Sequence, residues 1–270
     1  MRTLYVSDLD GTLLHSDETI SEYSVRTINA LVERGMLFSY ATARSYSTAS
    51  KITSGLITRV PLIVYNGAMM VEQQTGRILL SNFFGEDVRE LLDDLMAHDI
   101  YPIVYAVENG QERFSYLPAR CSRPLLDFTA TRRGDKRDHP VASAEELLEG
   151  EVFYLTCIDR AEKLEPFFER YRDKYHVVYQ RDIYTGEQWL EFMPRQASKA
   201  NAARQLCAWL KCDRLVVFGD GKNDVDLFAC ADECYAVENA VDELRQMATA
   251  VIGSNHNDGV ARWLLQNAEW

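Results

Sequence analysis

The stretch that decides the fold reads Asp8-Leu9-Asp10-Gly11-Thr12-Leu13-Leu14, directly after the apolar run 3–7. The run predicts a buried strand, so two carboxylates stand at a strand's carboxyl end, where open α/β sheets bind ligands. Gly11 permits a sharp turn there. An Asp carboxylate can attack phosphorus, and paired carboxylates are ligands that Mg²⁺ prefers. The alternative is a solvated turn, because Asp-Gly is a common turn pair.

A second acidic stretch, Phe218-Gly219-Asp220-Gly221-Lys222-Asn223-Asp224, also follows an apolar run. If the two runs are strands of one parallel sheet, Asp220 reaches the same edge as Asp8 and completes a metal site. Asn223 can then donate to a phosphate oxygen. Taken alone, the stretch also fits a polar turn in which Asn or Asp caps a helix. The two stretches together favour the site.

Two weaker signals lie between these stretches. Thr42, in Tyr40-Ala41-Thr42-Ala43-Arg44, follows a predicted strand, and its hydroxyl together with free backbone N–H groups can hold a phosphate. Lys199, near the start of an amphipathic helix, can neutralise phosphate charge. Taken alone, each residue fits a helix cap or a surface cation better than a ligand, so both depend on their context.

Strands and helices alternate at both ends of the chain. Before residue 82 we expect strands at 3–7, 36–41 and 62–65, a helix from Ser21 to Gly35, and a hairpin around Thr75-Gly76. Toward the end we expect helices at 198–210, 225–231, 240–248 and 259–267, and strands at 214–218, 234–237 and 250–252. This alternation predicts an α/β fold, a Rossmann-like doubly wound parallel sheet built from residues 1–82 and 194–270.

The middle of the chain has a different pattern and predicts an inserted α+β domain at 83–193. A helix is expected at 87–98, a hairpin around Glu108-Asn109-Gly110-Gln111, and further strands at 152–158, 177–180 and 189–193. Ser143 and Glu146 have the spacing of a capping box.

The stretch 120–137 is interpreted as a basic loop. It carries six basic residues against Asp127 and Asp135, a net charge of 6 − 2 = +4 in a chain of net charge −12. The pattern favours a solvated loop. The alternative is that one or two of its arginines enter the site and bind a second anionic group of the ligand. Tyr184, Glu187 and Trp189 are further candidates for ligand contacts. The basic residues are Arg120, Arg123, Arg132, Arg133, Lys136 and Arg137.

The length, charge and apolar content of the chain exclude several classes of protein. With 270 residues, 47% of them hydrophobic, the chain is long enough for a sizeable core. Its net charge of −12 and pI near 4.9 argue against general nucleic-acid binding. It has no apolar run of membrane-spanning length, and a charge precedes any apolar leader, so we expect a cytoplasmic protein with reduced cysteines.

These motifs resemble those of the haloacid dehalogenase-like (HAD) superfamily, specifically its Cof-type phosphatases with a type II-B cap. The resemblance covers nearly the whole chain. The first motif corresponds to Asp8-x-Asp10-Gly11-Thr12, the second to Thr42-x-Arg44, the third to Lys199, and the fourth to Gly219-Asp220-x-x-Asn223-Asp224. Asn66-Gly67-Ala68 and Asp258-Gly259-Val260 also match. The chain departs from the family at Val237-Glu238-Asn239-Ala240, where Met-Gly-Asn-Ala is common, and at Lys199-Ala200 in place of Lys-Gly.

The resemblance implies roles for these residues. Asp8 would attack phosphorus, and Asp10 would protonate the leaving oxygen and later activate water. Mg²⁺ would be held by Asp8, the backbone carbonyl of Asp10, and Asp220, while Asp224 would orient Lys199 or a metal-bound water. Thr42, Lys199 and Asn223 would contact the phosphate, with Arg44, Asn66 and Gly67 close to it.

The resulting hypothesis is a Mg²⁺-dependent phosphatase that acts on small phosphorylated metabolites, such as sugar phosphates or cofactor-related phosphates, through an aspartyl-phosphate. A phosphotransferase or mutase on the same intermediate is the first alternative. A non-catalytic sensor of phosphorylated metabolites is the second, although such a sensor needs no nucleophile. The inserted domain would choose the substrate, no nucleic acid or membrane partner is expected, and the protein would be a monomer or small homo-oligomer.

Overall fold

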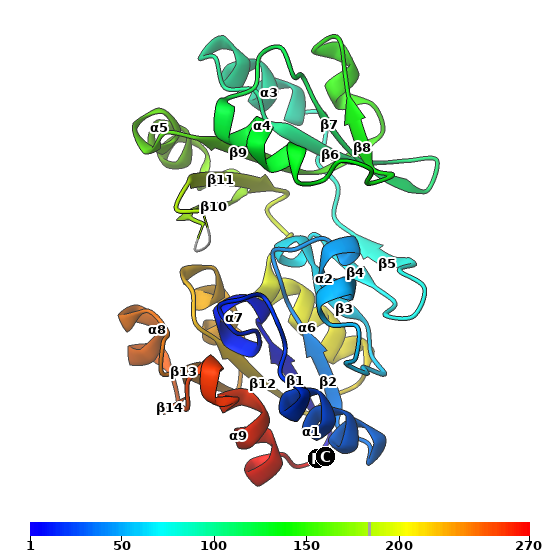
Figure 1. Ribbon diagram of the computed structural model, residues 1–270, viewed down its shortest axis with the longest axis vertical. Helices are drawn as coiled ribbons and strands as arrows, with labels where there is room; N and C mark the ends of the chain where they lie inside the picture. Colours follow the sequence, from blue (N-terminus) through cyan, green and yellow to red (C-terminus); the bar gives the residue numbers. More distant parts are fainter. Residues whose placement is uncertain (183–184) are drawn as a thin grey trace. The chain divides into compact units, whose positions relative to one another are not determined.

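The computed structural model describes residues 1–182 and 185–270, so Tyr184, a candidate ligand contact, lies outside the described residues. The chain divides into two compact units (Figure 1). The core unit comprises Met1–Ser81 and Ala197–Trp270, and the inserted unit comprises Asn82–Gln196.

The core unit is built on a five-stranded parallel sheet in the order β14-β13-β12-β1-β2. Its central strands are almost wholly buried, which explains why they read as continuous apolar runs in the sequence. The prediction of an α/β, Rossmann-like core is confirmed. The strands are β1 (Thr3–Ser7), β2 (Leu37–Tyr40), β12 (Arg214–Gly219), β13 (Glu233–Val237) and β14 (Ala250–Ile252).

Helices connect these strands, and their ends follow local capping rules. Ser21 accepts a hydrogen bond from the Ser24 backbone N–H at 2.9 Å and so begins the first helix where the sequence predicts it. The first and last helices pack together, and Trp263 of the last helix lies 4.2 Å from the Tyr235 ring, centroid to centroid. The helices are α1 (Glu22–Glu33), α2 (Tyr46–Ile52), α6 (Lys199–Trp209), α7 (Val225–Cys230), α8 (Asp242–Met247) and α9 (Gly259–Asn267).

The strand order reverses between β1 and β12. From β1 the chain continues to β2 on one side, whereas β12, β13 and β14 extend the sheet on the other side. Such a reversal leaves a crevice at the carboxyl ends of the two strands, where ligands bind in sheets of this kind. Ser7 is in register with Phe218, so the segments that follow both strands begin side by side.

A separate three-stranded antiparallel sheet belongs to the core unit. It consists of β3 (Leu62–Val64), β4 (Met69–Val71) and β5 (Ile78–Ser81), and the last two form the hairpin predicted around Thr75-Gly76. The predicted strand at 62–65 is therefore present as β3, but it pairs with β4 and meets the parallel sheet at an isolated bridge between Ala41 and Ile63. A helical turn, η2 (Tyr65–Gly67), joins β3 to β4.

The inserted unit is a six-stranded sheet in the order β10-β11-β9-β6-β7-β8, antiparallel except for the pair β7 and β8. Leucines of α3 (Val88–Ala97) and apolar residues of α5 (Ala161–Tyr171) pack on it and form its core. Asn109 and Gly110 both have positive φ angles, as the predicted hairpin requires. The strands are β6 (Ile103–Glu108), β7 (Gln111–Tyr116), β8 (Asp138–Pro140), β9 (Glu151–Asp159), β10 (His176–Arg181) and β11 (Gln188–Met193).

Two predictions for the inserted unit were wrong in part. The stretch 120–137 is not a loop throughout, because it contains α4 (Arg123–Ala130). Ser122 caps this helix because its Oγ accepts a hydrogen bond from Leu125 N–H. Pro124 lies in the first turn, where a backbone N–H has no partner within the helix, so its absence does not weaken the helix. The capping box at Ser143 is half formed: Glu146 accepts from Ser143 N–H at 3.0 Å, but only the single turn η3 (Glu145–Leu148) follows.

None of the helices in the described part of the chain has the length and apolarity needed to cross a membrane.

Candidate active site

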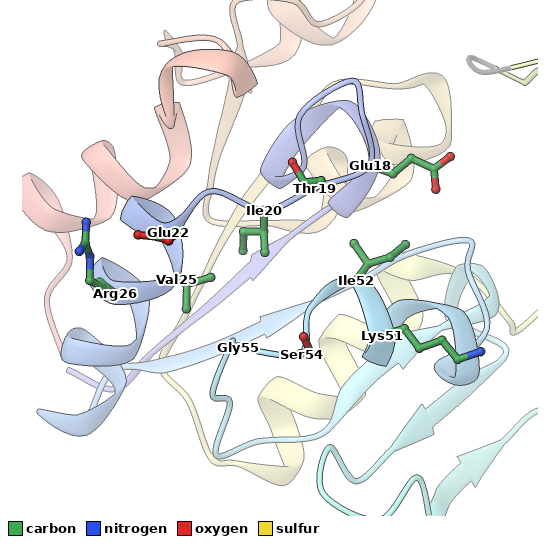
Figure 2. Close-up of a pocket in the computed structure, with 10 residues that line it drawn as sticks. All are labelled: Glu18, Thr19, Ile20, Glu22, Val25, Arg26, Lys51, Ile52, Ser54 and Gly55. Carbon is green, nitrogen blue, oxygen red and sulfur yellow. The ribbon is translucent and has the colours of Figure 1, made fainter.

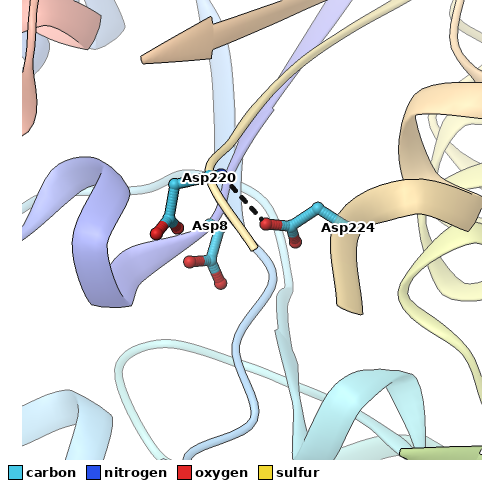
Figure 3. Close-up of side chains that lie close together, drawn as sticks. All are labelled: Asp8, Asp220 and Asp224. Carbon is cyan, nitrogen blue, oxygen red and sulfur yellow. Dashed lines mark hydrogen bonds between the residues drawn. The ribbon is translucent and has the colours of Figure 1, made fainter. Parts of the chain in front are cut away.

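Three aspartates from two neighbouring loops come together at the carboxyl edge of the parallel sheet (Figure 3). Asp8 follows β1, and Asp220 and Asp224 follow β12. Each offers one carboxylate oxygen, and these oxygens lie within 4.8 Å of one another. Asp8 and Asp224 are buried, and Asp220 is partly exposed. The structure thus brings together the two acidic stretches that the sequence singled out.

Lys199 lies between two of these carboxylates. Its Nζ is 2.5 Å from Asp8 Oδ1 and 2.7 Å from Asp224 Oδ1, and its side chain is 1% exposed. Ser198 caps α6 by accepting from Asn201 N–H, which places Lys199 in the first residue of that helix. A buried cation of this kind is tolerated only when it is paired and hydrogen-bonded, and here it is bonded to two carboxylates.

Asp224 is completely buried and holds both the lysine and its own loop. Its Oδ1 accepts from Lys199, while its Oδ2 accepts from the backbone N–H groups of Asp220 and Gly221, both at 3.1 Å. A Cβ on Gly219 would lie 2.8 Å from the same oxygen, so a glycine is needed at that position. Asp224 therefore fixes the loop that carries Asp220.

The electrostatics of this group favour an additional cation. Burial, opposed by the charge of Lys199, raises the pKa of Asp8 well above its usual value. Burial and then the charge of Asp224 raise the pKa of Asp220 to about 7. Burial disfavours the charged form of Lys199, but Asp224 and Asp8 outweigh it and raise the lysine's pKa. With all three carboxylates ionised, the group and the Lys199 ammonium would carry a net charge of −2, which a divalent cation would balance.

Gly11 allows the loop after β1 to approach Asp220 closely. Its φ is +77°, and a Cβ built there would lie 2.3 Å from Asp220 Oδ2. Next to it, Thr12 donates its hydroxyl to Asp220 Oδ1 at 2.8 Å. The first and second acidic stretches are therefore in direct contact through Asp220.

Gly11→Ala is expected to displace the Asp220 carboxylate. If the three aspartates hold Mg²⁺, the variant should bind that ion at least 10-fold more weakly, as a ~1.4 kcal/mol loss would do. The variant should also lose about 1–3 kcal/mol of stability, because the added methyl group both strains the positive φ and clashes. Gly110→Ala is the matched control, since Gly110 has φ +75° but nothing within 4 Å of its Cβ position. Calorimetric titration with Mg²⁺ and urea unfolding measure both effects, and equal Mg²⁺ affinity in the two variants would contradict the prediction.

The second motif supplies an arginine that contacts Asp10. Thr42 is fully buried, and its Oγ1 accepts from Arg44 N–H at 3.1 Å. The Arg44 guanidinium binds the Asp10 carboxylate through Nε at 2.8 Å and Nη2 at 2.6 Å. Its Nη1 lies 3.0 Å from Glu18 Oε2. Arg44 is thus held between two carboxylates.

Asn66, Gly67 and Asn223 lie on the loops around this site. Asn223 Nδ2 donates to Asn66 Oδ1 at 3.4 Å, which joins the turn η2 to the loop after β12. Asn66 and Gly67 both have positive φ angles, and a Cβ on Gly67 would lie 2.2 Å from the Ser198 carbonyl oxygen. Gly67 therefore permits η2 to pack directly against the start of α6, next to Lys199.

Two asparagines and one glutamate near the site were not predicted as functional residues. Asn239 Nδ2 donates to the Gly11 carbonyl at 2.7 Å, and its Oδ1 accepts from Asn255 N–H at 3.0 Å. Asn255 Nδ2 in turn donates to the Leu14 carbonyl at 2.9 Å. The stretch 237–240, although it departs from the family pattern, therefore still supports the loop after β1. Asn239 keeps the asparagine of the family's Met-Gly-Asn-Ala stretch, which is a sequence signal, whereas Asn255 and Glu18 lie outside every motif.

Four basic residues of 120–137 are bonded within the inserted unit. Arg120 lies 3.1 Å from Asp99, and Arg123 lies 3.0 Å from Asp127. Arg137 lies 2.7 Å from Asp135 and also pairs with Glu112. Arg132 stacks on the Phe128 ring, with Cζ 3.3 Å from the centroid. Arg133 and Lys136 are exposed.

The fold and the acidic group at its switch point define a Rossmann-like α/β protein with a carboxylate-and-lysine site. The chain belongs to the haloacid dehalogenase-like hydrolases, since the model of that family matches residues 5–264.

Individual relatives and solved structures agree with this assignment. The chain is 25% identical to the 5-amino-6-(5-phospho-D-ribitylamino)uracil phosphatase YitU of Bacillus subtilis, over 97% of this chain and 96% of the relative. It is 26% identical to the phosphatase YwtE of the same organism, named for the same substrate, over 96% of each chain. A haloacid dehalogenase-like hydrolase from B. subtilis superposes with a TM-score of 0.80 at 22% identity, over 100% of both chains. TM0651 from Thermotoga maritima superposes with a TM-score of 0.78 at 23% sequence identity, over 100% of this chain and 99% of TM0651.

Proposed function

We propose that the protein is a Mg²⁺-dependent phosphatase that hydrolyses small phosphorylated metabolites through an aspartyl-phosphate on Asp8. The observation that carries this proposal is the group of Asp8, Asp220, Asp224 and Lys199, largely buried at the switch point of the sheet. A carboxylate nucleophile, a fixed cation and an oxygen-rich cluster are what phosphoryl transfer to an enzyme side chain requires.

In the proposed reaction Asp8 is the nucleophile, and Asp10 is the general acid and then the general base. An Asp8 oxygen forms a bond to phosphorus while the bond from phosphorus to the leaving oxygen breaks, and Asp10 gives that oxygen a proton. Asp10 then takes a proton from water as the water oxygen attacks phosphorus, which releases inorganic phosphate and restores the Asp8 carboxylate. The contact of Lys199 with Asp8 supports the assignment of Asp8, because a cation there offsets the charge of the phosphate that it must approach.

The donor set fits Mg²⁺, which prefers hard oxygen ligands. We propose Asp8, Asp220 and the backbone carbonyl of Asp10 as its ligands. Both oxygens of Asp224 already accept hydrogen bonds, which favours a role for this residue in holding Lys199 and the loop of Asp220. When bound, Mg²⁺ supplies positive charge that offsets the repulsion between the nucleophile and the phosphate.

The remaining residues of the site would bind the phosphate or keep its surroundings in place. Lys199 and the Asn223 side chain offer N–H donors, and Thr42 offers a hydroxyl group. Asn66 and Gly67 support this set, because Asn66 contacts Asn223 and Gly67 lies against the start of α6. Arg44 pairs with the carboxylates of Asp10 and Glu18.

The substrate class follows from the names of the relatives. Two of them are named as phosphatases of a ribitylaminouracil phosphate, in which the phosphate is esterified to a sugar alcohol. We propose sugar phosphates or cofactor-related phosphates as substrates of this chain. The inserted unit would act as the cap that contacts the leaving group, and the exposed Arg133 and Lys136 are its basic candidates for a second anionic group.

Phosphate release from p-nitrophenyl phosphate tests this function directly. We expect turnover with Mg²⁺, its loss in EDTA, and its recovery when Mg²⁺ is restored, because the −2 group binds phosphate poorly without the cation. If no turnover is seen, a panel of sugar phosphates and nucleotide-related phosphates is assayed under the same conditions. The absence of Mg²⁺-dependent release from every compound would overturn the proposal.

A further inference from the structure

Glu18 lies outside every motif of the sequence and yet reaches the site through Arg44. Its Oε2 is 3.0 Å from Arg44 Nη1, on the side of the guanidinium that does not bind Asp10. Nε and Nη2 of the same group bind the two Asp10 oxygens, at 2.8 and 2.6 Å. Glu18, Arg44 and Asp10 thus form a chain of three charged groups that ends on the proposed acid and base.

The backbone of Arg44 is already fixed without Glu18. Its N–H donates to Thr42 Oγ1 at 3.1 Å, and its carbonyl accepts from Tyr65 N–H at 3.0 Å. Only the long side chain is left to be oriented, and an arginine side chain loses considerable rotamer freedom when it is held. A carboxylate at Nη1 restricts this freedom and turns the opposite edge of the guanidinium toward Asp10.

The loop that carries Glu18 is built to hold it in place. His15 N–H donates to the Thr19 carbonyl at 2.8 Å, Glu18 N–H donates to the His15 carbonyl at 3.1 Å, and the Thr19 hydroxyl donates to Asp17 at 2.6 Å. Within this closed turn Glu18 has φ +62°, a conformation that residues with a Cβ rarely adopt. Strained residues of this kind persist where the surrounding structure fixes them, and they are frequent at functional sites.

Glu18 also borders a groove of about 510 Å³ on the core unit (Figure 2). The groove is lined by residues of the loop before α1, the start of α1 and the end of α2, so the glutamate is open to solvent while Arg44 is largely buried. Glu22 lines the same groove and is exposed, and it offers an acidic neighbour for comparison.

From these contacts we infer that Glu18 is a positioning residue: it holds the Arg44 side chain, and Arg44 holds the Asp10 carboxylate where it serves the leaving oxygen. The inference rests on the proposed phosphatase function. Replacing Glu18 keeps the Asp8 nucleophile, Lys199 and the Asp220 carboxylate, so the rate of the first chemical step should fall only where that step needs a proton from Asp10. That need is large for a strongly basic leaving oxygen and small for a weakly basic one.

Glu18→Gln should therefore lower kcat/KM for phenyl phosphate about 10-fold and for p-nitrophenyl phosphate less than about 2-fold, as a partial loss of acid catalysis predicts. The two compounds have nearly the same shape but differ in the basicity of the released phenol. Arg44→Met should show the same selectivity with a larger loss, about 100-fold on phenyl phosphate. In the Arg44→Met background, Glu18→Gln should change neither value, because its route to Asp10 is gone.

Glu22→Gln is the matched control, with the same change of charge in the same groove, and it should behave as the wild type. Equal losses on both compounds in Glu18→Gln would indicate a merely structural role and overturn the inference, as would no loss on either. An unchanged effect of Glu18→Gln in the Arg44→Met background would overturn it as well. If the wild type itself hydrolyses neither compound and no other phosphomonoester, the proposed function fails, which is a different result.

Discussion

Asp8→Asn should abolish phosphatase turnover, with a loss of kcat of at least about 10³-fold, as expected when a nucleophile is removed. The amide has the shape of the carboxylate but is a far weaker nucleophile, so no aspartyl-phosphate can form. Asn can still accept a hydrogen bond from Lys199, which lies 2.5 Å from Asp8 Oδ1, and the fold should persist. Phosphate release from p-nitrophenyl phosphate under saturating Mg²⁺ measures the loss.

The control for this prediction is Asp226→Asn. Asp226 is an exposed aspartate of α7, two residues after the buried Asp224, and the same change of charge there should leave turnover at the wild-type level. Turnover by Asp8→Asn within 10-fold of the wild type would show that the phosphoryl group does not pass through Asp8. The group of Asp220, Asp224 and Lys199 would then need another interpretation, such as a site for direct attack by water.

Lys199→Met should have the second largest effect, on both stability and activity. The substitution leaves Asp8 and Asp224 buried without the ammonium that contacts both, and removing one partner of a buried ion pair costs about 3–5 kcal/mol. Since the same cation would neutralise the transferred phosphoryl group, kcat should also fall about 10²–10³-fold. Urea unfolding in EDTA and Mg²⁺-dependent phosphate release measure the two effects separately.

The loss of stability in Lys199→Met should depend on pH. Burial already raises the pKa of Asp8 in the folded protein, and Lys199 opposes this shift, so removing the lysine raises that pKa further. When the pKa of a carboxyl group is higher in the folded protein than in the unfolded chain, folding favours the protonated form. The free energy of unfolding therefore falls as the pH rises from the pKa of the unfolded state to that of the folded state. The loss of unfolding free energy in Lys199→Met, relative to the wild type, should therefore be smaller at pH 5 than at pH 8.

Lys211→Met is the control for both measurements. Lys211 is exposed and lies just beyond the other end of α6, so its replacement should change stability and turnover little at either pH. A stability of Lys199→Met within about 1 kcal/mol of the wild type at pH 8 would show that the buried ion pairs contribute no more than surface pairs do.

The sequence alone predicted the elements that depend on local patterns. Strand β1 begins and ends at the predicted residues, α1 starts after its serine cap, and the helices and strands after Lys199 match within about two residues, since buried strands and amphipathic helices have periods that short windows reveal. The two acidic stretches were also evident, because Asp and Gly directly after a buried run are unusual in a strand and characteristic of its end. The sequence alone did not predict α2, α4, α5 or β8. In α4, a high density of arginines concealed a short helix that begins after Ser122 and has Pro124 in its first turn.

Only the tertiary structure decided which of these side chains meet. Lys199 is 191 residues from Asp8 in the chain. The two side chains meet because β1 and β12 are neighbours in the sheet and α6 begins, at Lys199, next to the loops that follow these strands. The contacts of Arg44 with Asp10 and Glu18, and of Asn239 with Gly11, likewise join residues of different loops. Local sequence patterns do not predict such pairs, because strand order and loop conformation bring the partners together. For this protein, the sequence alone was therefore enough to predict the fold class and to single out the two acidic stretches that the fold brings together. The hydrogen bonds that join their side chains to other parts of the chain were decided by the tertiary structure.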